Sequence, residues 1–143
     1  MTGYDIIGDI HGCAAELEAL LNKLGYEQRG GCHKHPERQV IFLGDFIDRE
    51  PKQKEVINIV RPMIDEGAAK SVMGNHEFNA ICFATKHKEH GYVRPHTPKN
   101  NDQHEAFTNA YKFGSNEHDE IINWFKTLPV FLDIDGLLAV HAC

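Results

Sequence analysis

Residues 40–49 read VIFLGDFIDR, a short apolar run that closes in glycine and is followed at once by Asp45. The same arrangement occurs at two other places, where apolar runs that close in glycine are followed by Asp9 and by Asn75. Short apolar runs bounded by glycine are typical of buried strands. The sequence therefore predicts three strands, each with an oxygen-bearing side chain directly after its end.

Helical periodicity fills the two intervals between these strands. Leucine recurs at helical spacing over residues 17–24, and apolar side chains share one helical face over residues 56–64. An alternation of strands and helices is typical of an α/β fold with a largely parallel sheet flanked by helices. The carboxyl ends of parallel strands meet at one edge of a sheet, so we expect Asp9, Asp45 and Asn75 to lie together.

The second half of the chain is less regular. Residues 87–103 are polar, and we interpret them either as a solvated loop or as a lid over a site. Helices are expected at residues 105–113 and 118–128, followed by a hairpin over residues 130–140. Because the last apolar strand runs almost to the end of the chain, we expect residues 1–143 to be the amino-terminal part of one domain that is truncated at its carboxyl end.

Composition narrows the class of protein. The chain has 143 residues, of which 41% are hydrophobic and 25% are charged, as is typical of one globular domain. The formal net charge of −6 disfavours nucleic acid and anionic membrane surfaces as partners. No apolar run is long enough to span a bilayer. With no signal peptide and no CxxC pair, we expect a cytoplasmic protein with four reduced thiols, at Cys13, Cys32, Cys82 and Cys143.

The polar residues that follow the predicted strands have the chemistry of a metal site. Carboxylate, imidazole and amide groups suit manganese, iron or zinc better than calcium. Asp9 and His11 are two positions apart, so at an extended strand end both side chains can point toward one ion. Asp45 offers two oxygens that could bridge two ions, and such a pair of ions activates water for attack on phosphorus.

Three further residues suit the remaining steps of phosphate-ester hydrolysis. Arg49 has the planar fork that binds phosphate oxygens. His76 titrates near neutral pH and can protonate a leaving oxygen, and Asp48 is the carboxylate that could hold it. No Cys or Ser stands in the sequence context of a phosphatase nucleophile, which favours direct attack by water.

Three segments follow one another in a fixed order: GDIHG at residues 8–12, GDFIDR at residues 44–49 and GNHE at residues 74–77. Together they resemble the signature of the calcineurin-like metallophosphoesterase superfamily. The Asp-Arg ending of the second segment is most similar to the phosphoprotein phosphatase branch and its bacterial relatives, which include diadenosine tetraphosphate hydrolases. The resemblance covers residues 4–77, resumes at residues 138–141, and implies a sandwich of β-sheets flanked by helices.

The resemblance also implies a ligand set for two divalent cations, for which Mn²⁺ is the first expectation and iron or zinc are alternatives. Asp9 and His11 would bind the first ion, and Asp45 would bridge the pair. Asn75 and His141 would bind the second ion. The family places one more histidine ligand beyond the position of residue 143, so we expect the second ion to bind weakly here and turnover to be poor.

The same resemblance implies that His76 is the general acid, that Asp48 orients it, and that Arg49 binds the phosphate oxygens. The predicted function is hydrolysis of a phosphate monoester, including a phosphoprotein, by attack of a metal-bridging hydroxide. One alternative is hydrolysis of a dinucleoside polyphosphate such as diadenosine tetraphosphate. The other is a catalytically silent scaffold with the same fold. The family usually has glycine where this chain has Glu50, which could alter the loop or repel an anionic substrate.

The remaining polar residues near these segments are interpreted structurally. Glu77 is expected to complement the amino-terminal end of a helix dipole. Cys32, His33 and His35 lack the spacing and the fourth ligand of a zinc site, so we interpret residues 29–38 as a polar loop.

Overall fold

The computed structural model describes residues 3–142 of the chain. Its main sheet has three strands in the order β1-β4-β5, with both pairs parallel. The strands are β1 (Gly3–Ile7), β4 (Arg38–Phe42) and β5 (Ala69–Ser71). These are the three strands that the glycine-closed apolar runs predict, and the α/β class with a parallel sheet is confirmed.

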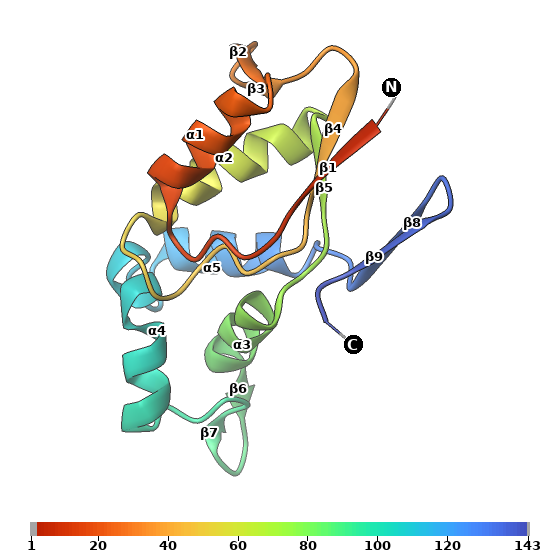
Figure 1. Cartoon of the computed structure of the whole chain (residues 1–143). Coiled ribbons are helices and arrows are strands. Elements are labelled where there is room, and N and C mark those ends of the chain that lie inside the picture. Colours follow the sequence, from red (N-terminus) through yellow and green to blue (C-terminus); the bar gives the residue numbers. More distant parts are fainter. Residues whose placement is uncertain (1–2, 143) are drawn as a thin grey trace.

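Two helices connect these strands and lie on the same side of the sheet (Figure 1). They are α1 (Ala14–Lys23) and α2 (Gln53–Asp65). Their apolar faces are buried against the sheet in one core, in which Leu21, Phe42 and Val60 have no exposed surface. Both helices thereby fix the positions of the loops that follow β1 and β4.

The interval between α1 and β4 differs from the expected polar loop. It contains a small antiparallel hairpin of β2 (Glu27–Arg29) and β3 (Cys32–Lys34). Cys32 and His33 are buried, and His33 Nδ1 lies 3.1 Å from the side-chain Nε2 of Gln28. The paired glycines between the strands make the turn, so the interpretation of residues 29–38 as a polar loop was wrong for its first half.

After β5 the chain forms α3 (Asn75–Ala84) and then a two-residue-per-strand hairpin of β6 (Lys86–His87) and β7 (Gly91–Tyr92). The next helix, α4 (Pro98–Ala110), begins seven residues before the predicted helix at 105–113. Thr97 caps it by accepting a hydrogen bond from the Asn100 amide at 3.2 Å, and Pro98 occupies the first turn. The expected irregular segment is therefore ordered, and its last part is helical.

The chain ends with α5 (Asn116–Phe125), β8 (Phe131–Ile134) and β9 (Leu137–Val140). As predicted, β8 and β9 form an antiparallel hairpin, which is a separate two-stranded sheet beside the main one (Figure 1). The Met73 amide donates to the Pro129 carbonyl oxygen at 2.7 Å and joins the hairpin to the end of β5.

Among residues 3–142, none of the helices combines the length and the apolar character that crossing a bilayer requires. Cys13, Cys32 and Cys82 are free thiols, and Cys143 lies outside the described residues.

Candidate metal centre and active site

The loops after β1 and β4 are joined by backbone hydrogen bonds. The amides of Ile10 and His11 both donate to the Asp45 carbonyl oxygen at 2.9 Å, and the Gly12 amide donates to the Phe46 carbonyl oxygen at 3.0 Å. The predicted ligands at these two strand ends are thus held by the main chain, independently of their own side chains.

Four of the predicted site residues have strained backbone conformations. His11, Asp45, Asp48 and Arg49 have φ angles of 45°, 56°, 67° and 74°. Within residues 3–142, the one other non-glycine residue with positive φ is Asp135, in the turn of the β8–β9 hairpin. Left-handed conformations at non-glycine residues cost free energy and gather at functional sites, so this cluster independently marks the loops as a site.

Glycine allows the loops after β4 and β5 to touch. A Cβ on Gly44 would lie 2.2 Å from the Gly74 nitrogen, and a Cβ on Gly74 would lie 2.2 Å from Asp45 Oδ1. No side chain fits in this contact. The two glycines therefore bring Asn75 next to Asp45.

Glu77 clamps the same two loops from inside the protein. Its fully buried carboxylate accepts hydrogen bonds from the amides of Asp45 at 2.6 Å, Phe46 at 3.0 Å and Gly74 at 3.1 Å. Burial, together with the nearby Asp45 carboxylate, raises the pKa of Glu77 to about 7. We expected Glu77 to act on the dipole of its own helix. It does lie in the first turn of α3 and caps this helix through the Gly74 amide, and its bonds to Asp45 and Phe46 also fix the backbone on which Asp45 stands.

His11 presents a bare nitrogen to the centre of the site. Its Nδ1 lies 2.7 Å from the Ile47 carbonyl oxygen, which can only accept, so Nδ1 donates and the neutral imidazole has its lone pair on Nε2. This Nε2 is buried and has no hydrogen-bond partner in the described chain. It lies 3.7 Å from Asp9 Oδ2 and 3.7 Å from Asp45 Oδ2. One imidazole nitrogen and two carboxylate oxygens therefore converge at this point.

His141 forms a second cluster of the same kind. Its Nδ1 donates to the Leu43 carbonyl oxygen at 2.7 Å, so the neutral imidazole again has its lone pair on Nε2. This Nε2 lies 2.9 Å from Asn75 Oδ1 and 3.3 Å from Asp45 Oδ2. The contact with Asn75 is within hydrogen-bond distance, and all three atoms are of the types that bind divalent cations. Histidine ligands typically donate their other nitrogen to a carbonyl or carboxylate, as both histidines do here, so the residues fit divalent ions.

The two clusters share Asp45 Oδ2, while Asp45 Oδ1 accepts a hydrogen bond from the His76 amide at 3.0 Å. Two groups of three side chains have possible ligand atoms within 4.8 Å of one another and could each hold a metal ion: Asp9, Asp45 and His141, and His11, Asp45 and His76. The structure therefore brings all the predicted ligands around one buried carboxylate. His76 also comes within reach of this centre, although it was predicted to be an acid.

Beside the clusters, Asp48 binds two histidines. Its Oδ2 accepts from His76 Nδ1 at 2.6 Å, and its Oδ1 accepts from His104 Nδ1 at 2.8 Å. Burial alone would raise the pKa of Asp48, but the hydrogen bonds from His104 and His76 outweigh burial and lower it. The bond to Asp48 raises the pKa of His76, against the opposing effect of burial. His104 was not predicted as a site residue, because nothing within the polar segment relates it to Asp48.

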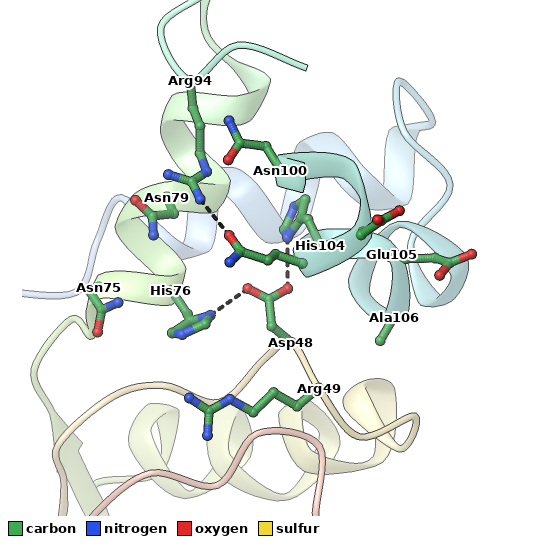
Figure 2. Close-up of a pocket in the computed structure, with 12 residues that line it drawn as sticks. Asp48, Arg49, Asn75, His76, Asn79, Arg94, Asn100, His104, Glu105 and Ala106 are labelled. Atoms are coloured by element: carbon green, nitrogen blue, oxygen red, sulfur yellow. Dashed lines mark hydrogen bonds and ion pairs between the residues drawn. The ribbon is translucent and has the colours of Figure 1, made fainter. Parts of the chain in front are cut away.

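A cavity of about 520 Å³ opens over this arrangement, between α3 and α4. Figure 2 shows Arg49 at one end of the cavity and Arg94 at the other, with His76, Asp48 and His104 between them. Arg49 is exposed and has no ion-pair partner among residues 3–142, so its guanidinium is free to bind an anion.

The strand ends of the parallel sheet bring possible metal ligands together around the buried Asp45 carboxylate. Beside them, His76 is hydrogen-bonded to Asp48. This arrangement is typical of metal-dependent phosphoesterases. The model of the calcineurin-like phosphoesterase family matches residues 4–142. The chain belongs to this family.

Proteins similar to this chain include bis(5'-nucleosyl)-tetraphosphatases. The chain is 49% identical over 74 residues to the asymmetrical enzyme PrpE of Halalkalibacterium halodurans, a match that covers 51% of the chain and 30% of that protein. It is 31% identical over 142 residues to the symmetrical enzyme of Janthinobacterium sp. (strain Marseille), which covers 99% of the chain and 43% of that protein. The chain thus spans less than half the length of these relatives.

Solved structures share the fold. A crystal structure of a proposed diadenosine tetraphosphatase superposes with a TM-score of 0.61 at 21% identity, covering 98% of the chain and 50% of that protein. A protein serine/threonine phosphatase from Saccharomyces cerevisiae superposes with a TM-score of 0.61 at 19% identity, covering 94% of the chain and 39% of that protein.

Proposed function

We propose that this chain carries the catalytic centre of a metal-dependent hydrolase that cleaves the phosphate chain of a dinucleoside polyphosphate such as diadenosine tetraphosphate. The sequence favoured a phosphate monoester and held the dinucleotide as an alternative. The named relatives support the alternative, because they are tetraphosphatases in both the asymmetrical and the symmetrical form.

The observation that carries the proposal is the convergence of His11 Nε2 and His141 Nε2 on Asp45 Oδ2. We propose that Asp9 and His11 bind one ion, Asn75 and His141 bind the other, and Asp45 bridges them. Two divalent ions, with Mn²⁺ as the first candidate, would activate water for attack on phosphorus and neutralise charge on the phosphoryl oxygens.

We assign three residues to the substrate. Arg49 binds oxygens of the phosphoryl group that is cleaved, and the cavity next to it gives room for the rest of the substrate. His76 delivers a proton to the leaving oxygen, and Asp48 fixes the orientation of the imidazole through the 2.6 Å bond to Nδ1. His76 Nε2 is then the nitrogen that faces the substrate.

A catalytically silent scaffold would have no use for these features. Left-handed backbone at four site residues costs stability, and Asp48 holds the His76 imidazole in one orientation, whereas binding of a partner at the surface requires neither feature. Their presence together favours an enzyme over a scaffold.

The proposal is tested by hydrolysis assays on the chain loaded with Mn²⁺, with Asp45→Asn as the control. We expect hydrolysis of para-nitrophenyl phosphate and of diadenosine tetraphosphate, both lost in Asp45→Asn, with a higher kcat/KM for the dinucleotide. A preference for a phosphopeptide or a simple monoester over the dinucleotide would return the assignment to a phosphomonoesterase. Equal rates in the wild type and Asp45→Asn would rule out a role for the proposed bridging carboxylate.

A further inference from the structure

The cavity beside Asp48 extends past the groups assigned so far, and Arg94 lines its far end (Figure 2). We infer that Arg94 forms a subsite for a second phosphate group, so that the chain selects extended phosphate chains over simple phosphate esters. This inference rests on the proposed function and assigns the recognition of the distal phosphates to one residue.

Most N–H donors of the Arg94 guanidinium have no partner in the described chain. Its half-buried side chain makes one hydrogen bond in the described chain, from Nη2 to Gln103 Oε1 at 3.2 Å, and no ion pair among residues 3–142. A guanidinium has five N–H donors in a planar fork that matches two phosphate oxygens. Most of these donors have no partner in the described part of the chain, and a half-buried cation without a counter-ion is suited to an anionic ligand.

The backbone under Arg94 is rigidly placed. The Arg94 amide donates to the Cys82 carbonyl oxygen at 3.1 Å. Two residues later, the His96 ring is stacked between Phe83 and Tyr92, with ring centroids 3.7 Å and 3.9 Å away. Because these contacts hold the start of the side chain in place, less conformational entropy is lost when the guanidinium binds.

Arg49 and Arg94 stand at opposite ends of the cavity, and His76 and Asp48 lie between them (Figure 2). A phosphate chain that has its reacting group at Arg49 and His76 can therefore continue through the cavity to Arg94. A single phosphoryl group reaches only the first end. The arrangement favours a ligand with several phosphates in line.

The rest of the lining is polar. It includes the amides of Asn79 and Asn100 and the carboxylates of Asp102 and Glu105, with Ala106 as its apolar side chain. Amides and carboxylates can hydrogen-bond ribose hydroxyls and base edges. The volume of about 520 Å³ is within the range of small-molecule sites. We therefore infer a nucleoside polyphosphate.

Binding without turnover tests this subsite directly. Calorimetry in EDTA would compare inorganic tripolyphosphate with inorganic phosphate on the wild type, Arg94→Ala, Arg94→Lys and the control Arg29→Ala, whose arginine is exposed and paired with Glu27. We expect Arg94→Ala to weaken tripolyphosphate at least tenfold more than phosphate, with Arg94→Lys intermediate and Arg29→Ala unchanged. Equal weakening of both probes, or none, would overturn the inference.

A kinetic comparison adds a second criterion. We expect the ratio of kcat/KM for diadenosine tetraphosphate to kcat/KM for para-nitrophenyl phosphate to fall at least tenfold in Arg94→Ala. A parallel loss with both substrates would show that Arg94 acts on the fold and not on the phosphate chain. If the wild type prefers a phosphopeptide, the proposed function fails, while the calorimetric result still decides whether the subsite exists.

Discussion

Each oxygen of the Asp48 carboxylate accepts a hydrogen bond from a different histidine. One oxygen holds His76, and the other is held by His104 from α4. His104 is buried, and it reaches Asp48 across 56 positions of sequence. We interpret His104 as a positioning residue, since it keeps Asp48 Oδ2 aimed at His76, the residue that we propose as the general acid.

Replacing His104 should therefore impair the proton transfer. A hydrogen bond to a charged group is worth about 1.5–3 kcal/mol, so His104→Ala should lower kcat by about tenfold to a hundredfold with little change in KM. His104→Asn keeps an N–H donor near the same place and should restore part of the loss. The measurement is steady-state kinetics with the Mn²⁺-loaded chain.

The choice of substrate separates positioning from a general structural effect. Loss of an aligned acid should slow phenyl phosphate more than para-nitrophenyl phosphate, because the poorer leaving group depends more on protonation. Equal slowing of both substrates, or no rescue by Asn, would argue that His104 merely supports the packing of α4.

Two glycines in equivalent sequence positions offer a second test at the scale of single residues. Gly8 precedes Asp9 and Gly74 precedes Asn75, yet a Cβ on Gly8 meets nothing within 4 Å while a Cβ on Gly74 would lie 2.2 Å from Asp45 Oδ1. Neither glycine has positive φ, so the difference between them is steric. We expect Gly74→Ala to displace Asp45, and Gly8→Ala to be tolerated.

Calorimetry with Mn²⁺ measures this difference. Gly74→Ala should weaken Mn²⁺ binding at least tenfold, because Asp45 is shared by both ligand clusters. Gly8→Ala should bind Mn²⁺ with the affinity of the wild type. Equal affinities in the two variants would mean that the loops after β4 and β5 can separate without affecting the site.

At the scale of elements, the sequence predicted what depends on local pattern. The strands β1, β4 and β5 follow from apolar runs closed by glycine, and the polar residues after them meet because parallel strands end at one edge. The start of α4 at Pro98 was missed although Thr97 and Pro98 are a helix-start signal, since the polar composition suggested a loop. The role of His104 depends on tertiary packing, for which the sequence holds no local signal.

The element α5 carries a buried histidine whose titration affects stability. Burial lowers the pKa of His118 below its ordinary value of 6.5, in a pocket where Phe107 and Phe113 lie 5.9 Å and 4.9 Å from its ring. The unfolded chain takes up this proton more readily than the folded chain. The contribution of His118 to the free energy of unfolding is therefore complete above the pKa that this histidine has in the unfolded chain, and it is lost as the pH falls below that value.

We expect the metal-free wild type to lose more stability than His118→Leu between about pH 7.5 and about pH 5.5, the range in which histidine titrates. Urea denaturation at several pH values measures the difference. His90→Gln is the matched control, because His90 is exposed and should leave the pH dependence unchanged. If His118→Leu retained the full slope, other groups would account for the acid sensitivity.

At the scale of the whole molecule, the proposed metal centre draws its ligands from loops near both ends of the described chain. Its proposed ligands come from the loops after β1 and β4, the start of α3 and the residue after β9. The hairpin of β8 and β9 pairs with no strand of the main sheet in the described chain and is joined to it by a few contacts, such as the bond from Tyr4 to Asp135 at 2.7 Å. His141 links this hairpin to Asp45. A bound ion at His141 should therefore hold the hairpin in place.

Hydrogen exchange of β8 and β9 tests this coupling. If opening of the hairpin breaks the His141 ligation, Mn²⁺ at 100 times its Kd stabilises the closed form by about 2.7 kcal/mol, which slows exchange by up to about 100-fold. His141→Ala should abolish this slowing in the hairpin. The β2–β3 hairpin is the internal control, because it supplies no ligand and should exchange at the same rate with and without Mn²⁺. Slowing of equal size in both hairpins would mean that the ion stabilises the fold globally, and no slowing in β8 and β9 would exclude His141 as a ligand.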